Sequence, residues 1–281
     1  SSDLTPPSSL PLFAAAEEWA RARGLNKLFG PKGFIPLDAF GILIQGFNYL
    51  PAMGGLYNYD YYDRLVTDAG FHKFTDVHSW YFSGDDMDVS QRVYDVAERV
   101  RQKRGITVKK FRTKKELIAM VPAIMEAYNN SFIENWEYVP ITPAETQYIV
   151  DRMLPISRPD LFAVALKGDE VIGFILGFPN INAAIKEINA RLWPFGFLKL
   201  LRAIKNTPWL DLNGAGVLPQ HQGGGAMIVL YAEIARIVHQ GGFKWVELVQ
   251  IEEGNDKMQA EVKQLGATLY KVHLLYEKAL Y

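Results

Sequence analysis

The chain has 281 residues, of which 49% are apolar and 22% charged, with a net charge of -1. Such a composition is typical of a globular protein with a sizeable core, in one large or two modest domains. The near-neutral charge excludes a general attraction to nucleic acid or anionic membranes, and the absence of cysteine excludes disulfides, thiolate catalysis and cysteine-bound metals.

The five histidines show no spacing typical of a metal site, and no apolar run reaches the length of a membrane span. The polar start of the chain lacks the basic and apolar blocks of a signal peptide. We therefore expect a cytoplasmic protein with no metal, no nucleic-acid partner and no membrane partner.

The N-terminal part contains elements that recur later in the chain. Residues 14–23 are predicted as a helix, followed by a short strand, and residues 60–80 as a helix, a Gly-Phe pair and a strand. The same order returns near residues 227–251 and 256–276, so we interpret residues 1–88 as a partial repeat with extra residues in 33–57. A connecting helix over residues 89–105 follows, with a basic end that we expect to be solvated. Its apolar face consists of Val89, Val93, Val96 and Val100.

Residues 106–281 are predicted as a complete domain. A strand over 106–112 and an amphipathic helix precede a second helix, whose start Thr142-Pro143-Ala144-Glu145 is a capping box with proline at the first helical position. Strands over 161–166 and 171–178 flank a predicted four-residue hairpin loop. Residues 180–207 form a long, partly helical insertion whose apolar residues pack on the fold or line a substrate cleft.

Three consecutive glycines, Gly223 to Gly225, lie between a strand over residues 209–217 and an amphipathic helix over residues 227–238. Glycine allows close approach of a ligand to the backbone, and the first turn of a helix presents free N–H groups and a positive dipole end. This arrangement predicts an anion site that would fit a pyrophosphate. A further strand (243–251), helix (255–266) and strand (270–276) complete the chain.

This order of elements resembles the GNAT superfamily of acyl-CoA-dependent N-acyltransferases. Val217-Leu218-Pro219 is similar to the end of the family's fourth strand, and its Gln/Arg-x-x-Gly-x-Gly/Ala loop follows. The loop begins at Gln220 in a literal match, or at Gln222 with Gly225 and Met227, which we prefer. Asn255, eleven residues before Gly266, is similar to the asparagine of the helix along the pantetheine arm. The implied fold is α/β, with a mixed central sheet flanked by helices.

The resemblance implies a cosubstrate site for acetyl-CoA or another acyl-CoA, without a metal. Backbone groups of the fourth strand would hold the pantetheine and thioester, and backbone N–H groups of the glycine loop would hold the pyrophosphate. The cosubstrate residues would be Ala215, Val217, Gln222, Gly223, Gly224, Gly225, Ala226 and Asn255.

The resemblance leaves the acid and base open. Asp211 is the leading general base, and Glu247 is a second candidate. Val262 stands where the family has its tyrosine general acid, so Tyr231 or Tyr270 would protonate the thiolate, water would do so, or catalysis is lost. The loop residues Glu134, Asn135 and Trp136 are candidates for acceptor contact or loop packing.

We therefore expect an N-acetyltransferase that acts on the primary amine of a small molecule, with a homodimer possible. Two alternatives stay open. One is a long-chain N-acyltransferase that uses acyl-CoA or an acyl carrier protein, with residues 180–207 forming an apolar tunnel. The other is a non-catalytic module that binds CoA or a partner protein.

Overall fold

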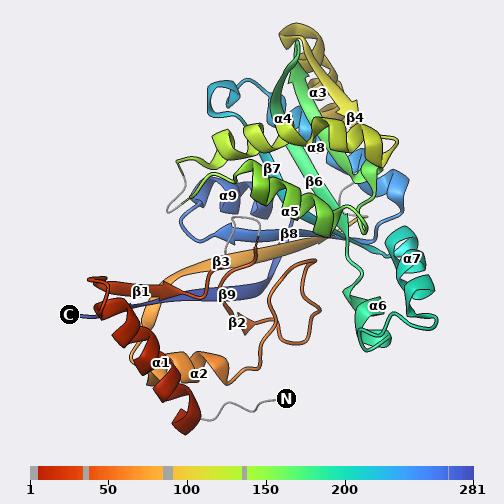
Figure 1. Cartoon of the computed structure of the whole chain (residues 1–281). Coiled ribbons are helices and arrows are strands. Elements are labelled where there is room, and N and C mark those ends of the chain that lie inside the picture. The colour runs from red at the N-terminus through yellow and green to blue at the C-terminus, as the bar shows by residue number, and fades with distance from the viewer. Residues whose placement is uncertain (1–5, 34–37, 85–90, 135–137, 265) are drawn as a thin grey trace. The chain divides into compact units, whose positions relative to one another are not determined.

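The computed structural model describes residues 6–33, 38–84, 91–134, 138–264 and 266–281 (Figure 1). Its contacts divide the chain into two compact units: unit 1 is Ser1–Trp80 with Gln250–Tyr281, and unit 2 is Tyr81–Val249. Two strands, β3 (His72–Ser83) and β8 (Trp245–Glu252), have residues in both units. The domain boundaries at residues 88 and 105, and the partial repeat, remain predictions.

Unit 2 carries a mixed sheet flanked by helices. Its strands lie in the order β8-β7-β6-β5-β4; the pairs from β4 to β7 are antiparallel, and β7 pairs with β8 in parallel. The predicted fold class is confirmed. Its elements are α3 (Gln91–Arg104), β4 (Ile106–Lys110), α4 (Lys114–Phe132), α5 (Pro143–Met153), β5 (Phe162–Lys167), β6 (Glu170–Pro179), α6 (Asn182–Glu187), α7 (Gly196–Asn206), β7 (Trp209–Val217), α8 (Ala226–Gly241) and β8, with 3-10 turns at Pro159–Leu161 and Pro219–His221.

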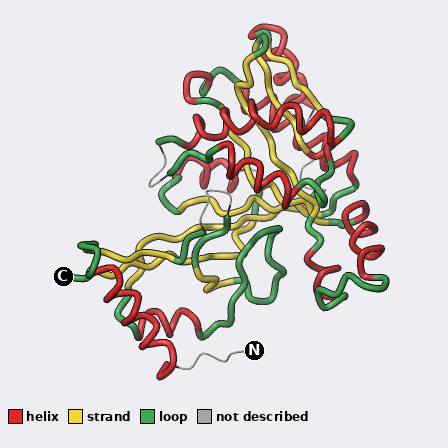
Figure 2. Tube along the Cα trace, viewed as in Figure 1, coloured by secondary structure: helices red, strands yellow, loops and turns green. Residues whose placement is uncertain are grey.

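The helices α4 and α8 cover opposite faces of this sheet (Figure 2). The ring of Phe174 on β6 lies 5.6 Å from that of Tyr128 on α4. At the neighbouring Gly173, a Cβ would lie 3.0 Å from Leu230 on α8. Because successive residues of a strand face opposite sides, these contacts define an α4 face and an α8 face.

Local sequence chemistry produces two of the predicted elements. The capping box of α5 forms in both directions: Glu145 N donates to Thr142 Oγ1 (3.3 Å), and Thr142 N donates to Glu145 Oε2 (2.8 Å). The hairpin of β5 and β6 forms with a shorter loop than predicted. Lys167 pairs with Glu170, and Gly168 takes φ +61°, so two residues complete the turn.

Unit 1 is arranged around β9 (Thr268–Ala279), the last strand of the chain. It pairs antiparallel with β1 (Lys27–Gly30) and with β2 (Ile42–Gln45). The helices of this unit are α1 (Pro6–Arg21), α2 (Tyr62–Asp68) and α9 (Asp256–Gln264). The two ends of the sequence therefore fold together.

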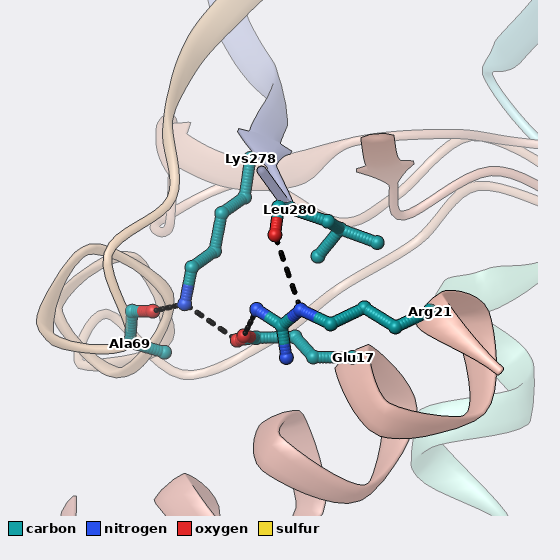
Figure 3. A network of polar contacts seen from close by, with 5 residues as sticks. All are labelled: Glu17, Arg21, Ala69, Lys278 and Leu280. Atoms are coloured by element: carbon teal, nitrogen blue, oxygen red, sulfur yellow. Dashed lines mark hydrogen bonds and ion pairs between the residues drawn. The ribbon is translucent and has the colours of Figure 1, made fainter. Parts of the chain in front are cut away.

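A polar network joins α1 to the end of β9 (Figure 3). Lys278 Nζ donates to the Glu17 carboxylate and, at 2.7 Å, to the carbonyl oxygen of Ala69. Arg21 binds the same carboxylate at 3.0 Å and donates to the carbonyl oxygen of Leu280 at 3.1 Å. The hydrogen bond from Lys278 is the main reason that the pKa of Glu17 lies below its ordinary value.

Candidate functional site

The three glycines form the turn that starts α8. Gly223 and Gly225 have φ +69° and +84°, and Gly225 is the N-cap of the helix. Gly224 N donates to the carbonyl oxygen of His221 at 3.2 Å, so this amide closes the turn. The first N–H groups of a helix have no acceptor within it, so those of Ala226 and the residues that follow provide positive partial charge at this point.

Helix α3 packs closely against the glycine turn. A Cβ at Gly225 would lie 2.8 Å from Cγ1 of Val100, which is tighter than side chains normally approach. Val100 is in the last turns of α3, and that helix ends with Arg101, Lys103 and Arg104. Lys103 and Arg104 at the end of α3 are exposed, as predicted, and Arg101 binds Glu98 at 3.0 Å.

Strand β7 separates from β8 halfway along its length. The described pairing of the two strands runs from Trp209↔Trp245 to Leu212↔Leu248, whereas β7 continues to Val217. Leu218 N donates to the carbonyl oxygen of Ile172, which makes this a hydrogen-bonded position of the ladder with β6. By the alternation of antiparallel ladders, Val217 and Ala215 direct their backbone groups away from β6, at the edge of β7 where the described pairing with β8 has ended.

Two features shape this open edge of β7, which runs from Asn213 to Val217 beyond the described pairing with β8. Gln222 Nε2 donates to the carbonyl oxygen of Val217 at 3.3 Å, so the glycine loop is tied to the strand. A β-bulge also interrupts β7, because its partners on β6 step from Ile175↔Ala215 to Gly177↔Leu212. Bulges bend a strand and re-aim its backbone groups, and here the bulge lies where the strands begin to separate.

The structure brings the two predicted carboxylates together. Asp211 on β7 and Glu247 on β8 are register partners, so their side chains lie on the same face. Asp211 also pairs with Phe178 of β6, which places it on the α4 face of the sheet. Both residues are buried, with 0% and 1% of their surface exposed. A proton therefore reaches either carboxylate only through a bound ligand or water.

Asn180, which the sequence does not single out, holds Asp211. Its Nδ2 donates to Asp211 Oδ1 at 3.2 Å, while its Oδ1 accepts from Asn182 N at 3.0 Å. The second bond fixes the orientation of the amide, so the nitrogen faces the carboxylate. Thr207 Oγ1 donates to the backbone carbonyl oxygen of Asn180 at 2.6 Å, which joins the two ends of residues 180–207. No local sequence pattern links residues 180 and 211, because their contact depends on the pairing of β6 with β7.

An aromatic cluster adjoins the carboxylates on the same face. Trp209 and Trp245 are register partners two positions before Asp211 and Glu247, and their rings stack at 5.7 Å. Tyr81 contacts both rings, at 6.1 and 5.8 Å. Because residues two apart in a strand lie on the same face, the register places the two tryptophans next to the two carboxylates.

The other predicted residues lie on further elements of the two units. Tyr231 is half-buried on α8, which covers the face opposite to that of Asp211. In unit 1, Asn255 Oδ1 accepts from Met258 N at 3.1 Å and so caps α9, and the Tyr270 ring contacts Tyr49 at 4.9 Å. Asn135 and Trp136 lie outside the described residues; Glu134 follows α4 and is exposed.

The described ranges contain no group of three or more His, Cys, Asp or Glu side chains that could hold a metal. Every helix in those ranges falls short of the length and apolar character needed to cross a bilayer.

Comparison with known proteins identifies the fold. The chain superposes on a GCN5-related N-acetyltransferase from Sphaerobacter thermophilus with a TM-score of 0.53 and 15% identity, over 96% of this chain and 67% of the other. The chain has the GNAT fold. A tandem GNAT protein from the clavulanic acid biosynthesis pathway gives a TM-score of 0.52 at 13% identity, over 96% and 69% of the two chains.

Two curated relatives match by sequence, whereas no family model matches. Protein YghO of Escherichia coli K12 is 28% identical over 278 residues, which are 96% of this chain and 70% of the relative. The bacterial ceramide synthase of Caulobacter vibrioides is also 28% identical over 278 residues, with 71% of the relative covered. Together with the GNAT fold, the second likeness supports the predicted class of acyl-transferring enzyme.

Proposed function

We propose that this protein is an acyl-CoA-dependent N-acyltransferase. The observation that carries the proposal is the open edge of β7 next to the glycine turn of α8. Outward backbone groups at Ala215 and Val217 can bind the amide groups of a pantetheine arm as another strand would. The N–H groups at the start of α8 can then bind the pyrophosphate of the same molecule.

A long acyl chain fits the name of the Caulobacter relative better than an acetyl group does. A ceramide is the amide of a fatty acid and a long-chain amino alcohol, and the Caulobacter relative is named for its synthesis. The solved GNAT structures are below 25% identity and support the fold alone. We therefore favour the long-chain alternative, with the primary amine of a lipid-like molecule as acceptor, over acetyl transfer to a small amine.

In the proposed reaction the neutral amine attacks the thioester carbonyl carbon, the C–S bond breaks, and an amide and CoA thiol are released. Asp211, positioned by Asn180, would accept the amine proton through a water molecule, because its side chain has no exposed surface. Glu247 lies beside it as a second acceptor. Tyr231 is a candidate to protonate the thiolate, from the α8 side of the sheet.

The absence of cysteine gives a direct test of this proposal. A thiol reagent reports only released CoA, because the protein contributes no thiol. Purified protein would be incubated with acetyl-CoA or palmitoyl-CoA and either sphinganine or a panel of small primary amines, with mass spectrometry of the amide. We expect CoA release with palmitoyl-CoA and sphinganine. Faster release with acetyl-CoA and a small amine would contradict the chain-length proposal, and binding of CoA without turnover of any pair would favour a non-catalytic module.

A further inference from the structure

The segment between β6 and β7 exposes large apolar side chains. This α6–α7 segment, residues 182–206, contains Trp193 with 82% and Phe195 with 70% of its surface exposed. The rings of Trp193 and Phe197 stack at 6.4 Å. Large apolar side chains that gather on a protein surface mark a contact with another apolar phase or molecule. Its further members are Leu192, Phe197, Leu198 and Leu201.

Helix α7 buries a different face. It contacts β6 and α6, and Figure 1 shows it beside α6. At Gly196, a Cβ would lie 2.0 Å from the carbonyl oxygen of Arg191, so the start of the helix is held against the preceding loop. Leu200 and Ile204, which are four residues apart, are partly buried, whereas Leu198 and Leu201 point to solvent. The exposed apolar residues are therefore additional to those that fix the helix in the fold.

Basic side chains border the exposed apolar residues. Residues 182–206 contain five Lys or Arg and a single acidic residue, Glu187, although the whole chain has a net charge of -1. Lys199 binds Glu187, and the other cations have exposed side chains. The cations are Lys186, Arg191, Lys199, Arg202 and Lys205.

We propose that the α6–α7 segment binds the surface of an anionic lipid bilayer. Trp, Phe and Leu beside Lys and Arg are the composition of helices that lie in the interface plane, with the rings at headgroup depth and the cations at the lipid phosphates. The net charge of the whole chain predicts no membrane partner, but the charge that a bilayer would meet is the local charge of this segment.

A second copy of the chain is a poorer occupant of this surface. In a two-fold symmetric dimer the same patch meets itself, so its excess of positive charge would face an equal excess. An anionic bilayer satisfies the apolar and the basic residues together.

Sedimentation with lipid vesicles tests the proposal without an activity assay. The full chain would be centrifuged with vesicles of phosphatidylcholine alone, or of phosphatidylcholine mixed with phosphatidylglycerol. We expect strong binding only to the mixed vesicles. The variant Lys199→Gln/Arg202→Gln/Lys205→Gln should lose about 100-fold in partitioning, since each cation near an anionic surface contributes about fivefold. Trp193→Ser/Phe195→Ser should lose at least about tenfold.

Matched control variants on the same unit test whether these losses of vesicle binding are specific to the α6–α7 segment. Lys109→Gln/Lys115→Gln/Lys167→Gln removes equal charge, and Val139→Ser/Tyr148→Ser removes exposed apolar surface. Both controls should bind as the unmodified protein does, and circular dichroism should show all variants folded. Failure of the unmodified protein to bind mixed vesicles would overturn the proposal, as would equal losses in controls and test variants. So would a concentration-dependent dimer that Trp193→Ser/Phe195→Ser abolishes, because the patch would then be a contact between copies.

Discussion

Replacing Gly225 by alanine should destabilise the protein for two separable reasons. The residue has φ +84°, where an L side chain is strained, and its Cβ would lie 2.8 Å from Val100 Cγ1. Gly223 provides the comparison: it has φ +69° but no atom within 4 Å of a Cβ. The two substitutions therefore share the backbone strain and differ in the steric conflict with α3.

The magnitudes follow from these geometries. Left-handed backbone costs alanine about 1–2 kcal/mol, which is the whole expected effect of Gly223→Ala. Overpacking adds about 1–3 kcal/mol at Gly225, so Gly225→Ala should reduce the free energy of unfolding by about 2–5 kcal/mol. In Val100→Ala the two methyl groups are gone, so adding Gly225→Ala to that variant should cost only the backbone strain.

Urea unfolding followed by tryptophan fluorescence would measure all four variants. The expected double-mutant cycle gives a coupling of about 1–3 kcal/mol between Gly225 and Val100. Equal effects of Gly225→Ala and Gly223→Ala, or no coupling to Val100, would refute the reasoning. Any side chain at Gly225 disturbs the packing of α3 on α8, so a substitution at this position does not isolate ligand binding.

Three further predictions concern other groups. Asp211→Asn should preserve CoA binding in calorimetry and lower kcat by about 10²–10⁴-fold if this carboxylate accepts the proton; unchanged kcat would exclude that role. Burial lowers the pKa of His273 from 6.5 to about 4, so the folded state should lose up to about 3 kcal/mol as pH falls from 6.5 to 4. His273→Gln should abolish this part of the pH dependence in urea unfolding, whereas the exposed His72→Gln should keep it. The lowered pKa of Glu17 predicts that Glu17→Gln is less stable than the unmodified protein at pH 7, and that the difference disappears as pH falls below the folded-state pKa; a difference that persists in acid would contradict the ion pair with Lys278.

Elements defined by neighbouring residues could be predicted from the sequence. The capping box at Thr142 and Glu145 acts over three residues, and its helix forms as expected. The glycine turn is equally local, with positive φ at Gly223 and Gly225. The hairpin loop is shorter than the four residues predicted, because Lys167 and Glu170 pair and extend the two strands.

Features that depend on strand register could not be predicted. The bulge in β7, the contact of Asn180 with Asp211 and the stacking of Trp209 on Trp245 all arise from the pairing of residues distant in sequence. The same holds for the pairing of β1 with β9. In the sequence Asp211 and Glu247 are separate candidates, and only the register shows that they are neighbours.

The most direct test of the account is whether one negative charge at the glycine turn prevents CoA binding. Gly223→Asn and Gly223→Asp have side chains of the same shape, both tolerate positive φ, and the site has open space for them. Calorimetric titration with CoA should show that the unmodified protein and Gly223→Asn bind, and that Gly223→Asp binds at least about tenfold more weakly through repulsion of the pyrophosphate. Equal affinity of the two variants, or no binding of CoA by the folded unmodified protein, would contradict the assignment of this turn to the acyl-CoA cosubstrate.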